Sequence, residues 1–229
     1  MNTILKNTGI NLVLGILLTL IWNCREKAVV EQPLKEVNVT KLISPVVKEF
    51  LEFANIPFTD TTTISSLMAF KTIDENSKVT NSDSEKNTKI YKNIIKGRST
   101  SSLLLFEIIG SDEVILVIPG RGNIGAIWAK ILIDTKRKEI LKLQFEHMVE
   151  SEGYGAAITQ ESYENQFIGK VLDNDSNDFG LKQSGMTLIE GNSMTDGISG
   201  ATITSKATVE MINQGLQNYR NTLEQPLDN

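Results

Sequence analysis

The fold is indicated by residues 103–147, which read LLLFEIIGSDEVILVIPGRGNIGAIWAKILIDTKRKEILKLQFEH. The stretch is rich in Leu, Ile and Val, and Gly110-Ser111-Asp112 is typical of a hairpin turn. In its last part apolar and polar side chains alternate, as they do in a strand with one buried face. We predict four strands here: Leu103–Ile109, Glu113–Ile118, Ala126–Asp134 and Glu139–His147.

Helices are predicted on both sides of these strands along the chain. Upstream, Ser44-Pro45 is typical of an N-cap followed by proline at the first helical position, and this helix should end before Asn55. Downstream, apolar residues recur at steps of three and four from Ser205 to about Leu223, which predicts an amphipathic helix. Because strands and helices do not alternate regularly, the predicted fold class is α+β: a twisted, mostly antiparallel sheet with packed helices.

Three other segments are less regular. Asp74–Lys89 and Asp173–Asp178 consist almost entirely of polar residues, which predicts solvated loops. The second segment resembles a calcium-binding loop superficially, but it lacks the glycine and the terminal glutamate spacing of an EF-hand. One or two helical turns are expected over Glu161–Ile168.

The composition excludes several classes of chemistry. The chain has 229 residues and a net charge of -5, which argues against nucleic acid as a partner because phosphate backbones repel an acidic protein. It contains one Cys and one His, so it cannot form an internal disulfide or an all-protein zinc or iron–sulfur site. We therefore predict no metal site and no catalytic side chains, and any redox chemistry must come from an organic cofactor.

The N-terminus is predicted to be a membrane anchor. The chain carries no charge from Asn7 to Cys24, and Leu12–Trp22 is almost wholly apolar. Such a run is close to the shortest that spans a bilayer as a helix, and it also suits a signal peptide with Cys24 as a lipid-carrying first mature residue. Trp22-Asn23 stand where small residues usually precede a lipidated cysteine, which slightly favours a retained helix. Both readings place the rest of the chain outside the cytoplasm.

One glycine-rich segment matches a dinucleotide-binding pattern. Gly120–Gly125 follows Gly-x-Gly-x-x-Gly after a predicted strand, and a helix should come next in that interpretation. Ala126–Ile133 fits a strand better than a helix, and Pro119 interrupts the entry. We therefore disfavour a dinucleotide site here.

A second small-residue segment leads into the C-terminal helix. Residues 196–205 read DGISGATITS, in which Gly200 and Ala201 allow close approach of a ligand to the backbone. The unpaired N–H groups and the dipole of a helix N-terminus favour an anion. A phosphate at Thr202 would lie next to those donors, with Lys206 one turn further on. The alternative is a plain helix cap at Thr204 or Ser205 with nothing bound.

This segment resembles the flavinylation motif Asp-x-x-(Ser/Thr)-Gly-Ala-Thr of the FMN-binding domain family. That family includes FMN-carrying subunits of the Na+-translocating NADH:quinone oxidoreductase and of the related ferredoxin-linked electron transport complex. Every specified position of the motif matches: Asp196, Ser199, Gly200, Ala201 and Thr202. The resemblance implies that Thr202 is esterified to the phosphate of FMN by a flavin transferase, and that Asp196 belongs to the sequence which the transferase recognises.

Further stretches resemble the same family: residues 122–128, 145–158 and 166–170. The resemblance implies that Gly153, Tyr154 and Gly155 border the flavin ring. Tyr154 replaces a leucine of the family, and an aromatic ring at this position can stack on the flavin. Ser151-Glu152 replace the Thr-Pro of the family, so the loop lacks the usual proline.

The resemblance completes the functional expectation. It divides the chain into residues 1–24 as the anchor, 25–88 as a tether, helix and polar loop, and 89–229 as an FMN-binding domain. The implied function is electron transfer by covalent FMN in a respiratory complex like the Na+-translocating NADH:quinone oxidoreductase, at the bacterial inner membrane with the domain facing the periplasm. The chain would be a redox subunit, not an enzyme alone, and its partners would be a flavin transferase, the membrane and the other subunits. The alternatives are a standalone membrane-anchored flavoprotein and an anchored binding module without flavin.

Overall fold

The computed structural model describes residues 43–59, 61–98, 102–172 and 178–224. None of the helices in these ranges combines the length and the apolar character that a membrane span requires. The predicted anchor at residues 1–24 lies outside the described residues. Contacts divide the chain into Met1–Val39 and Thr40–Asn229, and the description below concerns the second unit.

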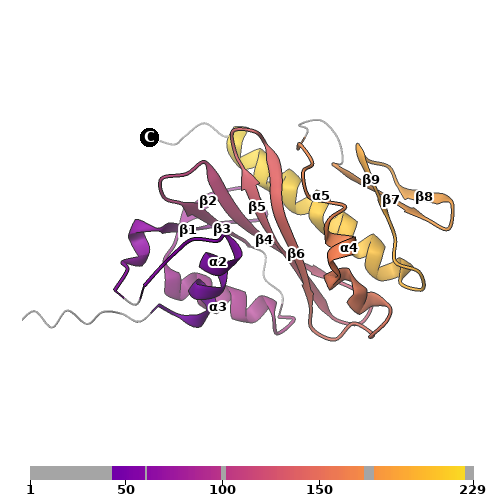
Figure 1. Ribbon diagram of the computed structural model, residues 1–229, viewed down its shortest axis with the longest axis horizontal. Coiled ribbons are helices and arrows are strands. Elements are labelled where there is room, and N and C mark those ends of the chain that lie inside the picture. Colours follow the sequence, from indigo (N-terminus) through magenta and orange to yellow (C-terminus); the bar gives the residue numbers. More distant parts are fainter. Residues whose placement is uncertain (1–42, 60, 99–101, 173–177, 225–229) are drawn as a thin grey trace, which may run out of the picture. The chain divides into compact units, whose positions relative to one another are not determined.

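A six-stranded sheet forms the centre of this unit (Figure 1). Its order is β2-β1-β3-β4-β5-β6, and every neighbouring pair is antiparallel. The strands are β1 Met68–Ile73, β2 Val79–Asn81, β3 Leu103–Ile108, β4 Glu113–Arg121, β5 Ala126–Asp134 and β6 Glu139–His147. The four strands predicted from the sequence are confirmed, as is the α+β class with a mostly antiparallel sheet.

A smaller sheet of order β8-β7-β9 lies beside the C-terminal helix (Figure 1). It consists of β7 Phe179–Gln183, β8 Met186–Ile189 and β9 Ser193–Asp196. β9 runs parallel to β7, and it ends at Asp196, where the small-residue segment starts.

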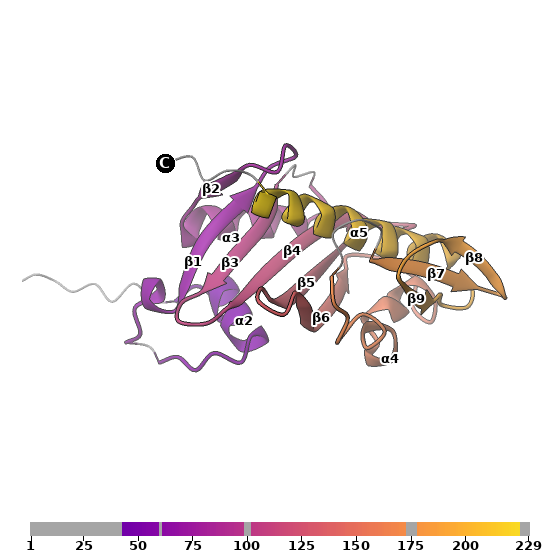
Figure 2. The same cartoon turned by 90° about the horizontal axis from the view of Figure 1, so that it is seen from above.

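Helices cover both faces of the large sheet, as Figure 2 shows. The helical elements are α2 Pro45–Phe53, η1 Ile64–Ser66, α3 Ser84–Ile94, η2 Gly155–Thr159, α4 Glu161–Glu164 and α5 Thr202–Glu224. α5 packs on one face in a core that includes Val209, Ile212 and Leu216, while α2 and α3 pack on the other through Phe50 and Tyr91.

β5 joins the two cores because it is buried on both faces. Ile127 and Ile131 face the α5 core, and Trp128 faces the α2–α3 core. Lys130, which is 3% exposed, also lies on β5. Its Nζ atom is paired with Glu49 at 2.8 Å and with Glu146 at 2.5 Å, so the buried charge is compensated.

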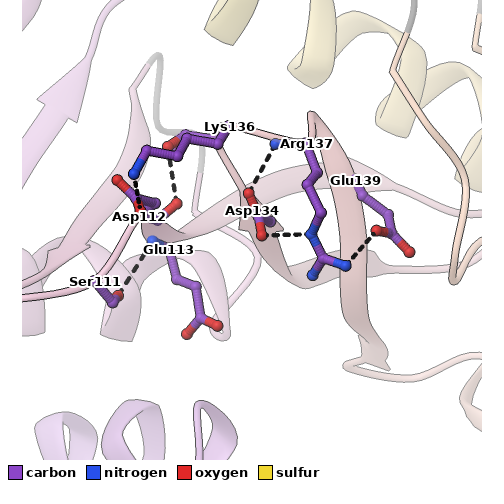
Figure 3. A network of polar contacts seen from close by, with 8 residues as sticks. Ser111, Asp112, Glu113, Asp134, Lys136, Arg137 and Glu139 are labelled. Carbon is purple, nitrogen blue, oxygen red and sulfur yellow. Dashed lines mark hydrogen bonds and ion pairs between the residues drawn. The ribbon is translucent and has the colours of Figure 1, made fainter.

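The turns at one end of the large sheet are solvated and charged (Figure 3). Residues 135–138 connect β5 to β6, and Lys136 Nζ lies 2.7 Å from Asp112 in the turn between β3 and β4. Arg137 is paired with Asp134 at 2.7 Å and with Glu139 at 3.1 Å. Because Lys136 and Arg137 are exposed, water screens the pairs and they contribute little to stability.

The helix predicted after Ser44 is confirmed. The Ser44 hydroxyl accepts a hydrogen bond from Val47 N–H at 3.3 Å, and Pro45 is the first helical residue. The helix ends at Phe53, and Asn55 has a positive φ of 56°.

The predicted loop over Asp74–Lys89 is wrong, because this stretch contains β2 and the first half of α3. Asp83 caps α3 by accepting a hydrogen bond from Lys86 N–H at 2.8 Å. The helix buries only Asn87, Tyr91 and Ile94, so its apolar stripe is too narrow to be recognised in the polar sequence. The large sheet thus begins at Met68, before the proposed boundary at residue 89.

Two further expectations need correction. Residues 173–177 of the predicted solvated turn lie outside the described residues, but Asp178 is buried and ion-paired with Arg220 of α5. The C-terminal helix begins at Thr202, three residues before the predicted start at Ser205. The helical repeat of apolar residues begins only after the first turn of α5, because that turn packs around polar side chains.

Candidate functional site

The segment between β9 and α5 is held by side chains from the turn after α4, from β7 and from α5 itself. Gln166 clamps the backbone of Asp196: Oε1 accepts from its N–H at 2.6 Å, and Nε2 donates to its carbonyl at 3.3 Å. The Asp196 side chain remains exposed. Two residues on, the carbonyl of Ile198 accepts from Gln183 Nε2 at 2.8 Å, and its N–H donates to Ser205 Oγ at 2.9 Å. The loop is therefore fixed at its start and at its middle.

Gly200 gives this loop its sharp turn into the helix. It has a φ of +74°, a conformation that glycine adopts without steric penalty. A Cβ atom there would lie 2.7 Å from Cδ1 of Tyr154, so the tyrosine ring lies on the side where a side chain would project. Ser199 and Gly200 are exposed, whereas Ala201 is buried.

Thr202 is the first residue of α5, and it is exposed. The alternative interpretation, in which Thr204 or Ser205 is the N-cap, is therefore wrong, because the helix already includes Thr202. The first N–H groups of a helix have no carbonyl partner within it. No backbone hydrogen bond recorded for the described residues has the N–H of Thr202, Ile203 or Thr204 as its donor. The helix thus presents unpaired donors, and the positive end of its dipole, beside the threonine hydroxyl.

A pocket of about 330 Å³ lies against this helix end. Its volume falls in the range of about 300–1,000 Å³ that is usual for ligand pockets. The lining residues are Asn123, Glu150, Ser151, Tyr154, Gly155, Gly200, Ala201, Thr202, Ile203 and Thr204.

The pocket brings together most of the residues predicted from the sequence. Tyr154 and Gly155 line it together with the acceptor segment, and Tyr154 is 56% exposed. Gly153, Ser199 and Asp196 are next to lining residues in the chain or close to them, but they do not line the pocket themselves.

Glu150 is the central residue of the site, and it is not among the residues predicted from the sequence. It is 5% exposed. One carboxylate oxygen accepts hydrogen bonds from the N–H groups of Ile124 at 2.8 Å and Gly125 at 3.0 Å. The other accepts from the hydroxyl of Thr204, on the first turn of α5, at 2.7 Å. A single side chain therefore joins the turn between β4 and β5 to the end of the helix that carries Thr202.

Two glycines make room for this carboxylate. A Cβ atom at Gly155 would lie 2.5 Å from Glu150 Oε2, and one at Gly122 would lie 2.6 Å from Oε1. Both distances are far below van der Waals contact, so any side chain at either position would displace the carboxylate. The glycine-rich character of the two loops thus follows from the way they close around Glu150.

The carboxylate is ionised more readily than usual. Burial raises the pKa of Glu150, but the hydrogen bonds from Gly125, Ile124 and Thr204 outweigh it, and the pKa lies below the ordinary glutamate value. Among the described residues that line the pocket, none is Lys, Arg or His. Lys206, which the sequence placed near the phosphate, is exposed and lies 3.6 Å from Glu210.

The turn at residues 122–125 also shows whether the Gly-x-Gly-x-x-Gly pattern has the structure of a dinucleotide-binding site. Gly122 N–H donates to the carbonyl of Gly125 at 2.8 Å, and the turn joins the antiparallel strands β4 and β5. No helix follows the glycines, so the interpretation of this motif as a strand-to-strand connection is confirmed.

A signal for Glu150 and Thr204 does exist in the sequence, although it is weak. Glu150 is the acidic residue that opens the glycine-rich stretch 150–158, and Thr204 lies on the side of α5 that also carries the buried Thr208. What links them is proximity between segments more than fifty residues apart, which a local pattern does not reveal.

Residues 122–217 match the family model described as FMN-binding domain. NqrC of Chlamydia caviae, a subunit of the Na(+)-translocating NADH-quinone reductase, is 29% identical over 126 residues, which are 48% of this chain and 40% of that subunit. NqrC of Yersinia pestis is 31% identical over 108 residues, 44% of this chain and 39% of that protein. The alignments thus span about two fifths of the length of these relatives.

Two solved structures share the fold. NqrC from Parabacteroides distasonis superposes with a TM-score of 0.55 at 22% identity, over 80% of this chain and 99% of that one. NqrC from Shewanella oneidensis has a TM-score of 0.55 at 18% identity, over 77% and 95% of the two chains. The resemblance inferred from the Asp196–Thr202 segment is confirmed. The match to the FMN-binding domain family extends over residues 122–217.

Proposed function

We propose that this protein is an electron-transfer flavoprotein whose FMN is linked by a phosphoester to Oγ1 of Thr202. The bound flavin supplies the electron transfer, and the protein supplies the attachment point, the pocket and the electrostatic environment. The observation that carries the proposal is the position of Thr202: an exposed hydroxyl at the N-terminus of α5, at the edge of a pocket of about 330 Å³.

The residues present fit a phosphate at this position. The unpaired N–H groups of the first helical turn can donate to phosphate oxygens, and the helix dipole favours the negative charge. Gly200 and Ala201 place no bulky side chain between the loop and the pocket. The described lining offers no cation, so the pocket alone would hold the doubly charged phosphate of free FMN weakly. A phosphoester to Thr202 would leave one negative charge on the phosphate and would retain the flavin covalently.

Attachment needs a separate flavin transferase. In the reaction the threonine oxygen bonds to the FMN phosphorus of FAD, the pyrophosphate bond breaks, AMP leaves, and the hydroxyl proton passes to a base. A threonine hydroxyl is a poor nucleophile without such a base. Glu150, the one carboxylate among the described lining residues, is already engaged by three donors. The exposed side chain of Asp196 is then free to be read by the transferase.

We further propose that the domain is anchored at its N-terminus to the inner membrane and works on the periplasmic side. Its redox partners would be the other subunits of a complex like the NADH-quinone reductase to which its relatives belong. The second candidate is a standalone anchored flavoprotein that delivers electrons to another acceptor outside the cytoplasm. Genes for the remaining reductase subunits beside this one would favour the complex, and their absence would favour the standalone protein.

The attachment is tested by intact mass and by in-gel flavin fluorescence after denaturation, on the full chain co-expressed with a flavin transferase. The expected result is an added FMN less one water, which is lost in Thr202→Ala. Thr222→Ala is the matched control, since it removes the same hydroxyl near the far end of α5. A protein of unmodified mass would contradict both flavin proposals and leave an anchored binding module.

A further inference from the structure

Hydrogen bonds to Glu150 connect two separate parts of the site. In the described part of the chain, this side chain is bonded both to the β4–β5 turn and to the first turn of α5. Gly122 and Gly155 close around the carboxylate so tightly that neither could carry a side chain. Thr204 is 2% exposed, so its hydroxyl is committed to this contact and is shielded from water.

We propose that Glu150 is the positioning residue of the flavin site. Its carboxylate holds the first turn of α5, and with it Thr202, against the glycine turn at residues 122–125, and it also provides a fixed negative charge in the pocket wall. The inference rests on the proposed attachment of flavin at Thr202.

The geometric part of the proposal follows from the spacing along α5. Thr202 and Thr204 lie in the same helical turn, with Thr202 exposed and Thr204 buried. Fixing the buried threonine to Glu150 therefore fixes the direction in which the acceptor hydroxyl points. Without the bond, this end of the helix would keep the hydrogen bond from Ile198 N–H to Ser205 Oγ but would lose its link to the β4–β5 turn.

The electrostatic part follows from the composition of the lining. Glu150 is the one carboxylate among the described lining residues, and no described lining residue is a cation. Reduction of a flavin adds negative charge to the ring, and a nearby carboxylate that is shielded from water disfavours that charge. The charge of Glu150 thus lowers the reduction potential of a flavin in this pocket.

Two substitutions separate the positioning effect of Glu150 on α5 from the effect of its negative charge. In Glu150→Gln the amide oxygen can still accept from Ile124 and Gly125, while the NH₂ group donates to Thr204, so the links remain and the charge is lost. In Thr204→Val the charge remains and the link to α5 is lost. Thr208→Val is the matched control, because Thr208 is equally buried one turn further along α5 and bonds to Tyr163 instead.

The experiment compares these variants with the full-length protein, co-expressed or incubated with a flavin transferase and FAD. Intact mass gives the rate of attachment, and a spectroelectrochemical titration gives the midpoint potential. We expect Thr204→Val to attach flavin roughly tenfold more slowly than Thr208→Val, the effect of losing a hydrogen bond to a charged group. We expect the potential of Glu150→Gln to lie above that of the unaltered protein, and that of Thr204→Val to shift less.

Equal attachment rates for the two threonine variants, or an unchanged potential in Glu150→Gln, would overturn the inference. If the unaltered protein takes up no flavin, the proposed attachment fails, and hydrogen exchange of the flavin-free proteins then judges the positioning role separately. Faster exchange at the first turn of α5 in Thr204→Val than in Thr208→Val would support it, and equal exchange would overturn it.

Discussion

At the scale of single residues, Gly200 combines two constraints that can be separated. Its φ of +74° strains any other residue, and a Cβ atom would also meet the ring of Tyr154 at 2.7 Å. We expect Gly200→Ala to lower the free energy of unfolding by about 1–3 kcal/mol, as strained backbone positions do. Urea denaturation measures this loss. Gly110→Ala is the control, because Gly110 has a φ of +84° but open space around its Cβ position. Equal losses in the two variants would show that the tyrosine ring adds nothing.

Glu150 should also leave a signature in acid. The pKa of Glu150 is lower in the folded protein than in the unfolded chain. The ionised side chain therefore makes its full contribution to stability at pH values above the ordinary glutamate pKa of about 4.3. This contribution is lost as the pH falls through the lower folded value. We therefore expect the free energy of unfolding to fall less steeply below pH 5 in Glu150→Gln than in the unaltered protein, as measured by urea denaturation at several pH values.

Glu164 also affects how stability depends on pH, and its contribution must be separated from that of Glu150. Burial raises the pKa of this residue in spite of its hydrogen bond from Phe145 N–H, so its effect on stability has the opposite sign. Glu164 is present in both proteins, and the difference between them isolates Glu150. Parallel pH profiles would mean that the three hydrogen bonds to Glu150 do not stabilise its ionised form.

At the scale of elements, the strands of the large sheet could be predicted where burial and turns leave a local pattern. β5 is apolar on both faces because it is central, and β6 alternates because one of its faces is less covered. β2 and α3 could not be predicted in this way, since α3 buries the polar Asn87 between its apolar residues. The parallel pairing of β7 with β9 depends on partners that local periodicity does not describe.

In the candidate site, too, contiguous residues could be predicted from the sequence, and residues brought together by folding could not. Thr202 and its loop are contiguous, so a motif could identify them and a helix N-terminus could be inferred behind them. Glu150 acts through Ile124, Gly125 and Thr204, which come together only in the folded chain. The predicted helix start is three residues late for a related reason. The first turn of α5 buries the polar residues Thr204 and Ser205, so it lacks the apolar repeat from which the helix was predicted.

The connection between α4 and the end of β9 gives a prediction at this scale. Gln166 makes two hydrogen bonds to the backbone of Asp196. Gln166→Leu removes both, and we expect it to lower the free energy of unfolding by about 1 kcal/mol and to slow flavin attachment, because the loop loses its anchor at the start. Gln160→Leu serves as the control on the preceding loop, where the exposed residue borders the same helix. A similar attachment rate in both variants would contradict a role of the clamp.

At the scale of the whole unit, the two ends of the large sheet are built differently. The turns between β3 and β4 and between β5 and β6 carry the charged pairs of Figure 3. The opposite end, where β4 turns into β5, carries Glu150 and the pocket. Several large apolar side chains are exposed around that pocket: Ile124, Val149, Tyr154 and Ile203. The pocket end thus combines exposed apolar side chains with the buried carboxylate of Glu150, around which Gly122 and Gly155 close.

The anchor is the last feature to test, and it belongs to the full chain. The uncharged run from Asn7 to Cys24 is close to the minimum of about 17 residues for a membrane-spanning helix. We expect the unaltered protein and Cys24→Ser both to remain in the membrane fraction after alkaline extraction. Replacement of residues 1–24 by a cleavable export signal should release a periplasmic domain that still takes up flavin. Release by Cys24→Ser alone would instead assign the anchor to a lipid on that cysteine, and an unaltered protein found in the soluble fraction would contradict both anchors.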